Sequence, residues 1–107
     1  MTDVALMRAL KALAHPTRFR MVQEIAAAGE LSCGQLGERF HLSQPTVSHH
    51  LKILADAQVI RVRRAAQHGM LSVDRARIGQ LLGALPELLA PAKTKARRGA
   101  RGKRAAN

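Results

Sequence analysis

The chain is poor in aromatic residues and cysteine. Its 107 residues include no Trp, no Tyr and only two Phe. A core must therefore be built from Leu, Ile, Val, Met and Ala, and such a core is thin for one subunit, which favours burial against a second copy. The single cysteine, Cys33, excludes an internal disulfide and is typical of a reducing cytoplasm.

Long hydrophobic runs are also missing. The N-terminus does not combine a basic start with an apolar run, so the sequence predicts no signal peptide. No uninterrupted apolar stretch approaches the ~20 residues that a membrane-spanning helix needs. We therefore expect a soluble cytoplasmic protein without membrane contact.

Acids are scarce, and the positive charge is unevenly distributed. Eighteen Lys and Arg stand against seven Asp and Glu, for a net charge of +11. Residues 93–107 hold seven of these basic residues and no acid, which leaves +4 for the rest. The sequence predicts one domain over residues 1–91 and a disordered basic tail over residues 92–107. Such a tail either aids solubility or attracts nucleic acid without sequence preference.

Apolar spacing predicts two helices before Gly29. The first covers about residues 2–13, and His15-Pro16 ends it and starts the second, because Pro suits the first helical position. Gly29 suits the position just beyond a helix. On the second helix we expect Met21 on the flank and an inner side formed by Phe19, Val22, Ile25 and Ala26.

A helix-turn-helix is predicted next. Ser32 and Gln35 form a capping box at the start of a short helix that ends near Phe40. The link His41-Leu42-Ser43 leads directly into another helix. Turns of this kind often contain Gly, so His41 must adopt the backbone conformation that Gly usually supplies.

The helix over about residues 43–54 has one apolar and one polar face. Ser43 caps it, and Val47, Leu51 and Leu54 point to the core. The opposite face suits a DNA major groove, although an ordinary solvated face is the alternative. We predict that Gln44, Thr46, Ser48 and His49 contact base edges or nearby phosphates, and that Ser43 and Lys52 contact phosphates. We predict a packing or hydrogen-bonding role for His50.

From Val59 the apolar period changes to two. The segment predicts a strand with Ile60 and Val62 inward, a loop over Ala65–Gly69 and a returning strand over Met70–Val73. Four basic residues cluster here without an acid: Arg61, Arg63, Arg64 and His68. They predict a wing that binds in or beside a minor groove, with charge protection of an edge strand as the alternative.

Asp74 caps a last, strongly apolar helix, which Pro86 is expected to kink or to split after Leu85. The order of elements is four helices, a hairpin and a helix. The sequence thus predicts a mainly α fold with a two-stranded β-hairpin wing, a winged helix-turn-helix.

Two segments, residues 12–18 (ALAHPTR) and 42–54 (LSQPTVSHHLKIL), closely resemble the ArsR/SmtB family of bacterial transcriptional repressors. The resemblance runs from about residue 4 to about residue 90. It implies a homodimer that represses genes by occupying an operator, an inverted repeat of DNA. It also implies dimer contacts from the first and last helices, which we assign to Leu6, Leu10, Leu81 and Leu85.

The metal sites of that family do not match. Its arsenic-type site is a Cys-Val-Cys motif, but here Ser32 and Gly34 occupy the two cysteine positions around Cys33. One thiolate cannot form a multi-sulfur site for a soft ion, and no His follows His68 for the other common site. We therefore predict neither metal nor cofactor. Cys33 is either an inert thiol or a redox sensor.

No catalytic constellation is present, so the sequence does not indicate an enzyme. We predict a sequence-specific transcriptional regulator, a dimeric repressor associated with the nucleoid when bound. The alternative is an architectural protein that coats DNA through its basic tail. A protein-interaction module without DNA binding is a third interpretation.

Overall fold

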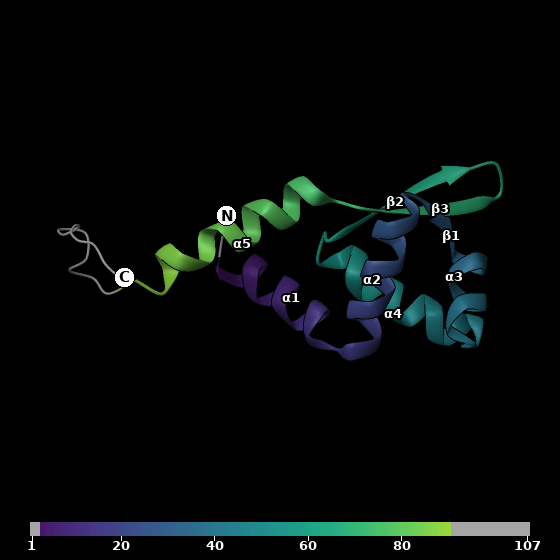
Figure 1. The fold of residues 1–107 in the computed structure, drawn as a ribbon, viewed down its shortest axis with the longest axis horizontal. Helices are drawn as coiled ribbons and strands as arrows, with labels where there is room; N and C mark the ends of the chain where they lie inside the picture. Colours follow the sequence, from purple (N-terminus) through teal and green to yellow (C-terminus); the bar gives the residue numbers. More distant parts are fainter. Residues whose placement is uncertain (1–2, 91–107) are drawn as a thin grey trace.

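The computed structural model describes residues 3–90, and within this range the chain forms five helices and three strands (Figure 1). The predicted tail, residues 92–107, lies outside the described residues. The elements follow one another in this order: α1 (Asp3–Ala14), α2 (Pro16–Ala28), β1 (Leu31–Ser32), α3 (Cys33–Phe40), α4 (Gln44–Asp56), β2 (Ile60–Ala65), β3 (His68–Val73) and α5 (Arg75–Leu88). The predicted sequence of helices, hairpin and final helix is confirmed.

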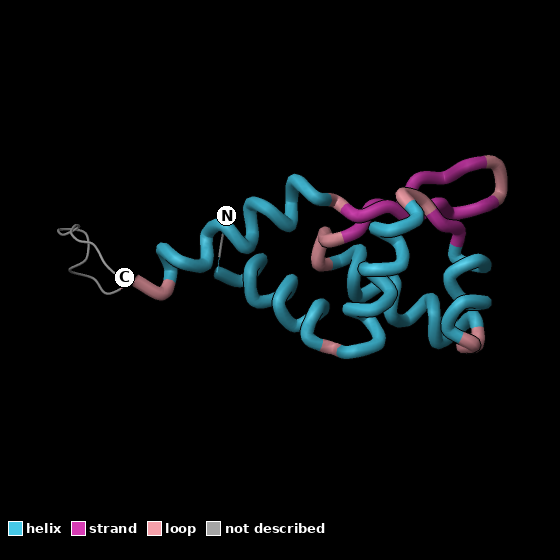
Figure 2. Tube along the Cα trace, in the orientation of Figure 1, coloured by secondary structure: helices cyan, strands magenta, loops and turns pink. Residues whose placement is uncertain are grey.

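The sheet has three strands, so the predicted two-stranded ribbon is wrong in this detail. The strand order is β1-β3-β2, all antiparallel, with Leu31 opposite Leu71 and Ser32 opposite Met70. Figure 2 shows the short β1 beside the hairpin, directly before α3. A strand of two residues has no alternating pattern, which explains why the sequence did not predict it.

The β2–β3 hairpin, hereafter the wing, is tighter than expected. Ala65 pairs with His68, so Ala66 and Gln67 alone make the turn in place of the predicted five-residue loop. Ala66 has φ 56°, a left-handed conformation that is costly for a residue other than Gly. The wing projects beyond the helices at one end of the molecule (Figure 1).

The core is aliphatic, and no buried residue within residues 3–90 is polar or charged. Every described helix and strand contributes to it: Leu6, Ala9, Ala12, Met21, Val22, Ile25, Leu31, Leu36, Val47, Leu51, Leu54, Ala57, Val59, Ile60, Leu71 and Leu81. This composition matches the set of residue types that the sequence left available for a core.

Two expected core positions are exposed. Phe19 is 49% exposed while Met21 is fully buried, because the inner face of α2 is centred on Met21, Val22 and Ile25, and Phe19 lies beyond its edge. Val62 is 56% exposed although it lies opposite the buried Leu71. It belongs to an edge strand that reaches past the helices, so one flank has no cover.

The last helix is not split at its proline. α5 continues through Pro86 to Leu88, and the amide of Leu89 still donates to the carbonyl of Leu85 at 3.1 Å. Pro86 lies in the exposed last turn, where the hydrogen bond that it removes is least costly. The predicted split after Leu85 is therefore wrong.

Candidate nucleic-acid interface

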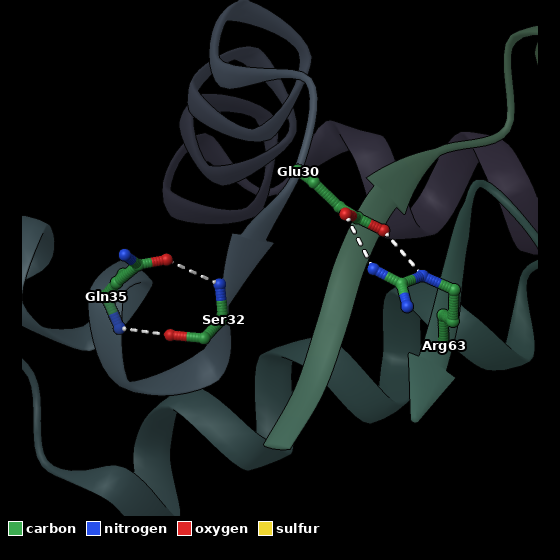
Figure 3. A network of polar contacts seen from close by, with 4 residues as sticks. All are labelled: Glu30, Ser32, Gln35 and Arg63. Carbon is green, nitrogen blue, oxygen red and sulfur yellow. Dashed lines mark hydrogen bonds and ion pairs between the residues drawn. The ribbon is translucent and has the colours of Figure 1, made fainter. Parts of the chain in front are cut away.

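Two caps and a left-handed residue set the path of the helix-turn-helix. Ser32 and Gln35 form the predicted capping box at the start of α3, with reciprocal bonds of 3.1 and 2.9 Å (Figure 3). His41 ends α3 at φ 54° and ψ 41°, as expected for a position that usually takes Gly. The chain turns there and enters α4 after Ser43.

Ser43 caps α4 as predicted. Its Oγ accepts a hydrogen bond from the Thr46 amide at 3.4 Å and donates to Thr46 Oγ1 at 3.0 Å. Val47 and Leu54 are fully buried on the opposite side, so the orientation of α4 is determined by the core. The predicted DNA-contacting residues of this region are all exposed: Ser43, Gln44, Thr46, Ser48, His49 and Lys52.

Not every group on this face is equally available. The hydroxyls of Ser43 and Thr46 already bond to each other, and Lys52 Nζ lies 3.3 Å from Asp56 Oδ2. The Lys52–Asp56 pair is strongly exposed, so it contributes little to stability and exchanges readily. The face therefore offers hydroxyl, amide and imidazole groups beside one readily released ammonium group.

His50 joins α4 to α2, which confirms its predicted packing or hydrogen-bonding role. Its Nδ1 lies 3.4 Å from Arg18 Nη1, and its ring centroid lies 5.0 Å from that of His15. Arg18 also donates from Nε to the carbonyl of Ala12 at 2.8 Å, at the end of α1. Burial lowers the pKa of His50, and three neighbouring groups act in the same direction: His15, Arg18 and His49.

Arg63, on the wing, is already paired. Its Nε and Nη2 donate to the two carboxylate oxygens of Glu30 at 3.0 and 2.9 Å (Figure 3). The hydrogen bond from Arg63 holds the pKa of Glu30 below its ordinary value. Sequence reasoning missed Glu30, because its position beside Arg63 depends on the unpredicted strand β1. That strand pairs with β3, which in turn pairs with β2, and this brings the residue before β1 close to Arg63.

Arg61 is paired as well. Its Nε donates to Asp74 Oδ2 at 3.0 Å, while Asp74 Oδ1 accepts from the Arg77 amide and caps α5 as predicted. These contacts lower the pKa of Asp74, the Arg77 amide bond first. Arg64 and His68 are exposed, and neither forms an ion pair with any residue in 3–90. The wing thus carries two compensated and two uncompensated basic side chains.

The leucines predicted as dimer contacts serve the chain's own core. Leu6 is 4% exposed and Leu81 is 1% exposed, and Leu10 and Leu85 pack partly against the same cluster. α1 and α5 contact each other, and together with Leu89, the residue that follows α5, they expose a different apolar set: Val4, Met7, Leu82 and Leu88. The first and last helices therefore do carry exposed apolar surface, but it is formed by residues next to the four predicted leucines. Which face of each helix is buried depends on how α1 and α5 pack against each other.

The part of the chain that the structure describes shows neither a cluster of metal ligands nor a helix that could span a membrane. No three His, Cys, Asp or Glu side chains gather there as metal ligands. Cys33 is half-buried, with Sγ 3.9 Å from the carbonyl of Gly69. None of the helices in residues 3–90 is long and apolar enough to cross a membrane.

A short capped helix, a second helix with a polar outer face and a basic hairpin define a winged helix-turn-helix of the DNA-binding class. A helix-turn-helix domain family matches residues 13–63. The chain is 40% identical over 57 residues to the transcriptional repressor SdpR of Bacillus subtilis, a match covering 53% of this chain and 62% of SdpR. It is 34% identical over 84 residues to the biofilm growth-associated repressor of Agrobacterium fabrum, covering 78% of this chain and 69% of that one.

A solved structure described as a possible transcriptional regulator for arsenical resistance superposes with a TM-score of 0.66 at 25% identity, covering 81% of this chain and 90% of that one. The chain belongs to the ArsR family of winged helix-turn-helix transcriptional regulators, which confirms the resemblance found in the sequence. These are DNA-binding regulators rather than enzymes.

Proposed function

We propose that this protein is a dimeric transcriptional repressor that binds an inverted-repeat operator. The observation that carries the proposal is the exposed polar face of α4, fixed by the Ser43 cap on one side and by the buried Val47 and Leu54 on the other. The names of the SdpR and Agrobacterium relatives, both repressors, support the direction of regulation.

On this proposal α4 is the recognition helix. Gln44, Thr46, Ser48 and His49 face the base edges of the major groove, and Lys52 leaves Asp56 for a phosphate. Ser43 contributes mainly by holding the first turn, since its hydroxyl is occupied. In a dimer, the two recognition helices would enter successive major grooves about 34 Å apart.

The wing contributes charge. Arg64 and His68 are available for phosphates or a minor groove without breaking an existing ion pair. Arg61 and Arg63 can join them only by exchanging Asp74 and Glu30 for phosphate. This ranks Arg64 and His68 above Arg61 and Arg63 among the predicted wing contacts.

The dimer is proposed to form through the free apolar surface of α1 and α5. Val4 and Met7 line a shallow groove along α1 together with Asp3, Arg8 and Lys11, and Leu82 is exposed on α5. Replacing Leu82 by Asp should give a folded monomer in light scattering, while Leu81→Asp should unfold the chain. A dimeric Leu82→Asp variant would place the interface elsewhere.

The proposed function is tested by footprinting on the DNA upstream of the protein's own gene, in about 0.15 M salt. We expect a protected inverted repeat. Thr46→Ala should weaken preference at particular base pairs, whereas Lys52→Ala should weaken binding to all sequences equally and lower the salt slope by about one. Protection without sequence preference would overturn the operator proposal.

The basic segment 93–107 supports a second candidate, an architectural protein that coats DNA. Removing residues 93–107 separates the two. A repressor keeps its sequence preference and loses general affinity with part of its salt dependence, whereas a coating protein loses nearly all binding.

A further inference from the structure

Gly37 lies where α3 and α4 approach each other. It is buried, and a Cβ built on it would lie 2.8 Å from Gln44 Nε2, closer than real Cβ contacts essentially ever come. Its other neighbours, Val47 Cγ2 at 3.5 Å and the carbonyl of Leu42 at 3.8 Å, would be at ordinary contact distance. The missing side chain of Gly37 therefore leaves room for one group in particular, the carboxamide of Gln44.

Gln44 is the first residue of α4 and is exposed, and the Nε2 end of its carboxamide rests on α3 beside Gly37. A carboxamide reads a base edge through hydrogen bonds whose direction depends on how the amide is oriented. A long side chain aims well only when packing restricts its rotamers. Contact with Gly37 supplies that restriction.

We propose that Gly37 is a positioning residue for recognition: it seats the amide of Gln44 and so determines which base pair the start of α4 selects. This inference rests on the proposed function, since it requires α4 to read DNA. It assigns a specificity role to a residue on α3 that makes no DNA contact itself.

The chain provides a matched control on the same helix. Gly34 is exposed, and a Cβ there would meet only Ser32 Oγ, at 3.9 Å. Gly37→Ala and Gly34→Ala both replace a glycine of α3 with a better helix former. Only Gly37→Ala displaces Gln44, and that displacement is tolerable for folding because Nε2 is the far end of a flexible side chain.

The test compares wild type, Gly37→Ala, Gly34→Ala, Gln44→Ala and the double variant Gly37→Ala/Gln44→Ala. Each full-length protein is melted and then titrated with operators in which every base pair has been changed in turn. Gly37→Ala should keep the wild-type melting temperature or exceed it. It should lose about tenfold discrimination at the same base pair as Gln44→Ala. The double variant should lose no more, and Gly34→Ala should match wild type.

Undiminished preference in Gly37→Ala, or additive losses in the double variant, would overturn the inference. If Gly37→Ala fails to fold, recovery of folding in the double variant supports Gln44 as the crowded neighbour, and no recovery overturns it. Absence of any sequence preference in the wild-type protein would instead contradict the proposed function.

Discussion

Arg63 and Glu30, which stand 33 residues apart in the chain, form a forked ion pair with bonds of 3.0 and 2.9 Å. The pair reaches from β2 to the residue just before β1, and so it ties the wing to the start of the helix-turn-helix. It also compensates the charge of Arg63, one of the wing residues proposed to meet DNA. Glu30 thus determines whether the charge of Arg63 is available, as Asp74 does for Arg61.

Replacing Glu30 by Gln should therefore strengthen DNA binding. The freed Arg63 guanidinium gains a phosphate, and the slope of log K against log salt should steepen by about 0.9. Titrations at several salt concentrations measure both effects. Glu87→Gln removes the same charge from α5, which extends away from the wing (Figure 1), and should leave the slope unchanged. An unchanged slope in Glu30→Gln would show that Arg63 does not reach DNA.

The partly buried position of His50 predicts a pH-dependent stability. Its folded pKa lies below the ordinary 6.5, so the unfolded chain binds the proton more readily. The contribution of neutral His50 to the free energy of unfolding is therefore fully present above about pH 6.5, and it is lost as the pH falls from there through the folded pKa. Thermal melts at about pH 7.5 and about pH 5.5 should show a smaller drop for His50→Gln than for wild type.

His68→Gln is the matched control for that experiment, because His68 is exposed on the wing and should retain the wild-type drop. An equal drop in wild type and His50→Gln would assign the pH dependence to other groups. The titratable and charged groups around His50 are His15, Arg18 and His49.

Substitutions of Ser43 distinguish its role in stabilising α4 from its proposed role at the DNA. Ser43→Ala should lower the free energy of unfolding by about 1 kcal/mol, because the first turn of α4 loses its side-chain acceptor. Ser43→Asp should restore that stability, since Asp both caps and complements the helix dipole. Its charge should nevertheless repel phosphate. Urea denaturation and DNA titration together would show restored stability with impaired binding; impaired stability in Ser43→Asp would refute the cap's role.

His41 adopts a backbone conformation that costs about 1 kcal/mol or more for residues with a Cβ. His41→Gly relieves this cost, whereas His41→Ala retains it and removes the same imidazole. The Gly variant should therefore be more stable than the Ala variant by about 1 kcal/mol in denaturant melts. Equal stabilities would mean that the turn relaxes around either residue.

Several features determined within four residues of sequence were predicted correctly, although the length of the turn in the wing and the effect of Pro86 were not. The caps at Ser32, Ser43 and Asp74 and the left-handed turn at His41 are local, because each depends on the residue type and its immediate neighbours. The apolar face of α4 follows from helical spacing alone. The sequence could thus predict which residues form the exposed candidate recognition face.

Features determined by distant segments were missed or misplaced. The strand β1, the partners of Arg61 and Arg63, and the burial of Leu81 all depend on which part of the chain lies alongside. The exposure of Val62 also depends on distant segments. Its alternation with Arg63 places the two side chains on opposite faces of β2, as predicted, but its exposure is explained by the edge position of β2 in the sheet.

The two residues of β1 have a consequence for operator design. Ser32 pairs with Met70 of the wing, and the next residue, Cys33, already belongs to α3, so no loop separates the strand paired with the wing from the first helix of the helix-turn-helix. On the proposed function, this connection keeps the bases read by α4 and the phosphates met by the wing at a nearly constant distance along the DNA. One base pair inserted between those contacts would rotate them apart by about 35°, and it should therefore weaken binding.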